Sequence, residues 1–166
     1  MLLTIFLAIV FCAAITLMLL SAVAFIQNTN FFSSAPKEAQ RALMPRDREL
    51  FYGARTIGWA LMVFSILMIL GVGIVSIWDG LRSGFTFWQF FLRFVLIFTI
   101  YKLYDMICFD YFLLCKFRFF QHYYPEVEEV YQNRKYGFNV KSQLLKLLVL
   151  FPAASALAAW VCALFG

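Results

Sequence analysis

Long apolar segments alternate with polar segments along the chain. The apolar segments cover about residues 3–26, 56–78, 85–109 and 145–165. Each is long enough to cross a hydrocarbon core of about 30 Å as a helix, which takes roughly 20 residues. The sequence therefore predicts an all-α, polytopic membrane protein in which residues 1–166 form a single four-helix transmembrane bundle.

The amino-acid composition agrees with this pattern. Hydrophobic residues make up 64% of the chain and charged residues 14%, whereas soluble domains are about 45–50% apolar and about 25% charged. A soluble enzyme, a disordered chain and a secreted disulfide scaffold are excluded on these grounds. Because no Lys or Arg precedes the first apolar segment, we expect a retained helix and not a cleaved secretory signal.

The positions of the basic residues predict the orientation. They gather in two polar loops, at residues 27–55 and 110–143, whereas the turn between the second and third spans contains only Arg82. Since Lys and Arg favour cytoplasmic loops, both loops are predicted to be cytoplasmic and both termini to lie outside. The formal net charge of +5 then implies contact with anionic lipid head groups and no binding of nucleic acid.

The third span contains ionisable side chains, which cost about 2.5–3.5 kcal/mol each at the centre of a membrane helix. They are Arg93, Lys102, Asp105 and, just beyond, Asp110. At 100° per residue Lys102 and Asp105 are about 60° apart and suited to an ion pair, whereas Asp105 and Asp110 are about 140° apart. Two interpretations stay open. One is a structural ion pair with an Arg93 that reaches toward water, and the other is a polar site for an amphiphile, an ion or a proton.

Aromatic residues surround the cytoplasmic end of this span. Tyr101, Tyr104 and Tyr111 suit either the lining of a binding site or an interfacial belt. The aromatic pattern continues to Phe120, so we expect the third helix to be long and to project into the cytoplasm. No metal site and no cofactor are predicted, because His122 has no second histidine or cysteine cluster beside it in the sequence.

Two further local patterns predict structure. Pro125, the acidic residues after it and Gly137 predict a helix from about Pro125 to Tyr136. Small residues mark surfaces at which membrane helices approach closely. In this chain they are Gly71 and Gly73 in the second span and Ala153, Ala154, Ser155, Ala156, Ala158 and Ala159 in the fourth.

The order of several short motifs resembles a group of uncharacterised bacterial four-helix membrane proteins. The motifs are Ala35-Pro36, Met44-Pro45-Arg46, the aromatic run Phe87–Phe91 and the paired aspartates of Tyr104–Tyr111. The resemblance covers roughly residues 35–165. It implies a multi-pass protein of the bacterial plasma membrane, the inner membrane, and it implies no particular activity.

These patterns favour a non-catalytic membrane protein, a partner-binding or sensing module with a basic cytoplasmic face. Its expected partners are the lipid bilayer and either a membrane protein or further copies of the chain. One alternative is a membrane enzyme, or a protein that binds an amphiphile or an ion, with Asp105 and Asp110 at the cytoplasmic interface. The other is an oligomeric transporter coupled to ions or protons. Whether the chain is an enzyme stays open at this point.

Overall fold

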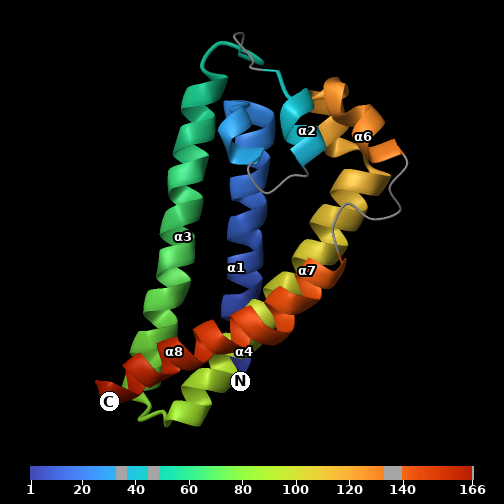
Figure 1. Cartoon of the computed structure of the whole chain (residues 1–166). Coiled ribbons are helices and arrows are strands. Elements are labelled where there is room, and N and C mark those ends of the chain that lie inside the picture. Colours follow the sequence, from blue (N-terminus) through green and yellow to red (C-terminus); the bar gives the residue numbers. More distant parts are fainter. Residues whose placement is uncertain (33–36, 45–48, 133–139, 166) are drawn as a thin grey trace. The chain divides into compact units, whose positions relative to one another are not determined.

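A computed structural model describes residues 1–32, 37–44, 49–132 and 140–165, and every element in these ranges is a helix (Figure 1). The all-α prediction is therefore confirmed. The chain divides into two compact units. Unit 1 comprises residues 1–14, 67–106 and 138–166, and unit 2 comprises residues 15–66 and 107–137. Each unit is described by itself below.

Four long α-helices provide the framework, and three of them are extended by π-helical turns, in which backbone hydrogen bonds join residues five apart. The long helices are α1 (Leu2–Leu20), α3 (Ala54–Arg82), α4 (Phe87–Tyr104) and α8 (Phe151–Leu164). The π-helical segments are η1 (Ser21–Ile26) after α1, η3 (Asp105–Lys116) after α4 and η5 (Lys146–Leu150) before α8. The shorter elements are η2 (Thr29–Phe32), α2 (Lys37–Ala42), α5 (Phe119–Tyr123), η4 (Pro125–Val127), α6 (Glu128–Gln132) and α7 (Val140–Leu145).

Three helical segments are long and apolar enough to cross a membrane: Leu2–Ile26, Ala54–Arg82 and Gln143–Leu164. They coincide with the first, second and fourth predicted spans, which supports the assignment to membrane proteins. The third predicted span forms α4 and η3 and is not among the three.

In unit 1, α4 packs against the other long helices. One apolar cluster joins it to α1 and α3 through Leu7, Ala8, Val72 and Ile97. A second cluster joins it to α8 through Phe90, Phe94, Ala159 and Cys162, and the two helices lie side by side in Figure 1. Within this unit the charged helix thus packs against α1, α3 and α8.

The turn between α3 and α4 is fixed by two successive caps. Gly84 has a φ of 64°, and the Phe85 amide donates to the carbonyl of Gly80 at 2.9 Å, which is the Schellman ending of a helix. Two residues after Gly84, the Thr86 amide donates to the Gln89 side chain at 2.8 Å. This bond is the one expected at the start of a helix with a capping box. The chain therefore reverses within a few residues, and the last turn of α3 faces the first turns of α4.

Close packing of α3 occurs at glycines other than the two predicted, namely Gly58 in unit 2 and Gly80 in unit 1. A Cβ atom at Gly71 or Gly73 would meet no atom of the described residues within 4 Å, so the prediction of a close contact there is wrong. A Cβ atom at Gly80 would instead lie 2.2 Å from the ring of Phe90. On α8 the prediction is confirmed at Ala159, which is buried against α4.

In unit 2 short helices pack around one apolar cluster of Val23, Ala39, Tyr124 and Val127. The predicted helix after Pro125 begins there, first as the 3₁₀ turn η4 and then as α6, while its predicted end at Tyr136 lies outside the described residues. The third helix ends earlier than expected, at Lys116 and not near Phe120. The reason is Arg118, whose φ of 49° interrupts the helix before α5.

Candidate functional site

Arg93 is the most buried cation among those residues of unit 1 whose burial the structure describes, with 4% of its surface exposed. Its Nη2 donates to the Asp79 carboxylate at 2.7 Å and its Nη1 to the Ser76 carbonyl at 2.9 Å. The guanidinium also lies over the Phe85 ring, 4.3 Å from the ring centre. The tight α3–α4 turn explains this arrangement, because it places the last turns of α3 opposite Arg93. An arginine expected to reach toward water is instead held by α3.

The sequence pattern does not indicate a functional role for Asp79. It follows Trp78 directly, at the position where the second span meets polar residues. A charged residue there is ordinary for a membrane helix. The one signal that points to a pairing is the short turn between the second and third spans, since it limits how far apart the last turn of one and the first turns of the other can lie.

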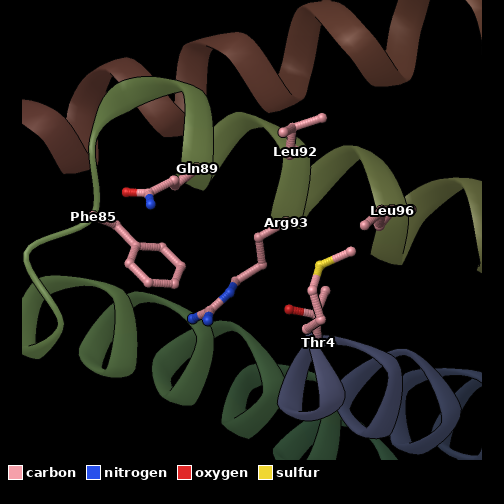
Figure 2. A pocket seen from close by; sticks show the side chains of 7 residues that line it. Thr4, Phe85, Gln89, Leu92, Arg93 and Leu96 are labelled. Carbon is pink, nitrogen blue, oxygen red and sulfur yellow. The ribbon is translucent and has the colours of Figure 1, made fainter.

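A cavity of about 210 Å³ adjoins Arg93 within unit 1. Its lining residues are Met1, Thr4, Phe85, Gln89, Leu92, Arg93 and Leu96. Figure 2 shows the Arg93 side chain reaching from α4 toward α3, with Phe85 on one side and Thr4 of α1 on the other. The Nε atom of Arg93 is buried and has no hydrogen-bond partner among the described residues.

Lys102 and Asp105 form the ion pair that their spacing predicts. The side chains are 6% and 18% exposed, so the pair is largely withdrawn from the surface of unit 1. This pair and the Arg93–Asp79 pair have different partners and form two separate polar sites on the same helix. The predicted ion pair is confirmed.

Asp110 belongs to unit 2, and one of its carboxylate oxygens is fully buried. It lies inside η3, where the α-helical angle of 140° from Asp105 does not apply, because η3 is a π-helix. The Cys115 thiol donates to the Asp110 carbonyl at 3.2 Å, five residues away.

The three tyrosines differ in burial and in their aromatic neighbours. Tyr101 packs inside unit 1, edge to face with Phe11 at 5.3 Å and near Phe151 of α8. Tyr104, also in unit 1, is half-buried. Tyr111, in unit 2, is exposed and packs edge to face with Phe112.

Neither metal-ligand clusters nor similar proteins indicate an activity. Among the residues that the structure describes, no group of three His, Cys, Asp or Glu side chains could hold a metal ion. No protein-family model, no curated protein and no solved structure matches this chain.

Proposed function

We propose that the chain is a non-catalytic integral membrane protein of four spans, a partner-binding or sensing module with a basic cytoplasmic face. α4 would be the fourth membrane-crossing helix, beside the three apolar ones, with both termini outside. The observation that supports this most is the pairing of the cations of α4. Arg93 is bonded to Asp79, and Lys102 to Asp105.

The pairing removes the main obstacle to placing α4 in a membrane. An unpaired charge at the centre of a membrane helix costs about 2.5–3.5 kcal/mol, whereas each pair here has no net charge. Polar side chains in membrane proteins face the interior of the bundle. Arg93 and Lys102 are both buried, and so α4 presents its charges to its neighbours. Such pairs hold helices in register and need not take part in chemistry.

The described part of unit 2 exposes both cations and acids, and the exposed acids are Glu38, Glu49 and Glu129. Its exposed cations are Lys37, Arg41, Lys116 and Arg118. Large apolar side chains are exposed in the same unit, among them Phe51, Tyr52 and Phe117. Basic and aromatic side chains together are typical of protein surfaces at the head-group level of a membrane. Anionic lipid head groups are therefore the partner that this composition favours.

Reconstitution with lipids of different charge tests this proposal. The full chain is placed in nanodiscs of phosphatidylcholine with or without phosphatidylglycerol, and its thermal unfolding is followed. Anionic lipid should raise the Tm, and the variant Lys37→Gln/Lys116→Gln should lose at least half of this increase, since each cation near an anionic surface contributes about 1 kcal/mol.

The matched control is Arg82→Gln, which removes a cation in unit 1 on the predicted outer side. This control is measured in oriented vesicles, with phosphatidylglycerol confined to the leaflet that faces unit 2. There the Tm of Arg82→Gln should rise by as much as that of the wild type. Equal Tm values in the two lipid mixtures would contradict the basic face. A protein partner captured by the wild type and not by the double variant would replace lipid as the ligand of this face.

A second candidate function assigns Asp105 and Asp110 a direct role. The chain would then be a membrane enzyme, a protein that binds an amphiphile or an ion, or an oligomeric transporter coupled to ions or protons. The specific observation in its favour is that both aspartates lie in η3, since π-helical turns are frequent at functional sites. Under this alternative Asp105→Asn and Asp110→Asn would each stop proton or ion flux in liposomes without loss of folded protein. The control Glu129→Gln changes an exposed acid of α6 and should leave the flux unchanged.

A further inference from the structure

The cavity beside Arg93 has a polar floor and an apolar margin. Thr4 and Arg93 are buried at its floor, whereas Met1 and Leu92 are 87% and 57% exposed. Leu96 adds further apolar lining. In a membrane, exposed side chains such as Leu92 would contact lipid, so the outer part of the cavity would face hydrocarbon. Its inner part contains a hydrogen-bond donor, the guanidinium of Arg93.

One nitrogen of the Arg93 guanidinium has no partner in the part of the chain that the structure describes and can donate to a ligand. Two of its nitrogens are bonded to α3, while Nε is buried without a partner among the described residues. An unsatisfied buried donor costs about 1–3 kcal/mol, and a water or a ligand oxygen in the cavity would remove that cost. The cavity volume of about 210 Å³ exceeds that of a single water, about 30 Å³ in the liquid.

The charge balance at the cavity selects the kind of acceptor. The Arg93 charge is matched by Asp79 at 2.7 Å. An anion beside Nε would be repelled by the Asp79 carboxylate, which accepts from the same guanidinium, and this repulsion is strong in a region of low dielectric constant. A neutral carbonyl oxygen accepts the same hydrogen bond without that cost. The apolar margin accommodates a hydrocarbon chain attached to such a carbonyl.

We propose that the Arg93 cavity is a binding site for a membrane amphiphile with a neutral ester or amide carbonyl. The carbonyl oxygen accepts a hydrogen bond from Nε of Arg93, and the acyl chain lies along Leu92 and Leu96. This inference rests on the proposed membrane placement, but it does not depend on the basic face of unit 2. The two therefore fail independently.

Thermal unfolding of the full chain in dodecyl maltoside tests the proposal with three probes. Monoolein has an ester carbonyl and an acyl chain, its alkyl ether analogue lacks the carbonyl, and triacetin has carbonyls without a long chain. A ligand at one hundred times its Kd should raise the Tm by about 5 °C or more. We expect this shift with monoolein, a shift at most one quarter as large with the ether, and none with triacetin.

Three variants connect the shift to the cavity. Arg93→Lys keeps the charge but removes Nε, and should abolish the monoolein shift. Leu96→Trp fills the cavity without changing the ion pair, and should abolish it even if Arg93→Lys fails to fold. The control Arg82→Lys makes the same exchange at an exposed arginine beside Trp78 and should keep the shift.

Four results would overturn the inference. The first is equal shifts with ester and ether, and the second is a shift that persists in Leu96→Trp. The third is a triacetin shift as large as that of monoolein, which would indicate a soluble ligand. The fourth is no shift in the wild type with any probe, which would indicate that water alone occupies the cavity.

Discussion

The contact between α3 and α4 at Gly80 predicts a specific loss of stability on substitution by alanine. A Cβ atom at Gly80 would lie 2.2 Å and 2.6 Å from two ring atoms of Phe90. The Phe90 ring has no exposed surface. It lies against Phe85 at 5.6 Å and Phe94 at 6.2 Å between ring centres, and in one cluster with Ala159. The ring therefore cannot move away without displacing α8.

The magnitude follows from two opposing effects. Insertion of a methyl group into a filled site costs about 1–3 kcal/mol, and alanine stabilises a helix interior by about 1 kcal/mol relative to glycine. Gly80→Ala should therefore lower the free energy of unfolding by up to about 2 kcal/mol. Gly73→Ala, on the same helix with nothing within 4 Å of its Cβ, should raise it by up to about 1 kcal/mol. The difference between the two variants isolates the overpacking of Phe90.

Thermal unfolding of both variants in dodecyl maltoside measures this difference. At about 2–4 °C per kcal/mol for a chain of this size, Gly80→Ala should have a Tm several degrees below that of Gly73→Ala. Combining Gly80→Ala with Phe90→Leu should reduce the penalty, because the smaller side chain leaves room for the methyl group. A Tm of Gly80→Ala equal to or above that of Gly73→Ala would refute the close contact.

Three further predictions use the same unfolding assay. Arg93→Gln should lower the free energy of unfolding by about 3 kcal/mol, because Asp79 loses its partner. Adding Asp79→Asn should recover at least about 1 kcal/mol, and strictly additive losses would contradict the pairing. Lys102→Met should lower the free energy of unfolding by about 3 kcal/mol, whereas Lys102→Met with Asp105→Leu should lower it by less than about 1 kcal/mol. A double variant as unstable as Lys102→Met would indicate a further role for the pair. Gly84→Ala should cost about 1 kcal/mol because of its positive φ, and an unchanged Tm would contradict the Schellman ending of α3.

The sequence was sufficient to predict the helical class and the places of three apolar helices. The reason is that a membrane helix must satisfy every backbone hydrogen bond within its own segment, so length and hydropathy are enough to recognise it. The Lys102–Asp105 pair was predictable for a similar reason, since both residues lie on one helix three positions apart. Local spacing alone determined that contact.

Tertiary contacts and hydrogen-bond register were not predictable in the same way. The partner of Arg93 lies on another helix, fourteen positions away, and its position depends on the geometry of the α3–α4 turn. The glycines of α3 that permit close packing, Gly58 and Gly80, could not be told from Gly71 and Gly73 by the apolar pattern. The π-helical register of η3 is not visible in the alternation of apolar and polar residues, so α-helical angles do not describe this segment.

Site-specific labelling tests most directly whether α4 crosses the membrane. In a variant without the native cysteines, Ser83→Cys lies in the turn before α4 and His122→Cys in α5, and both positions are exposed. A membrane-impermeant maleimide added to intact cells should label Ser83→Cys, and should label His122→Cys only after the membrane is opened. Labelling of both positions in intact cells, or of neither, would place them on one side of the membrane and contradict a fourth span.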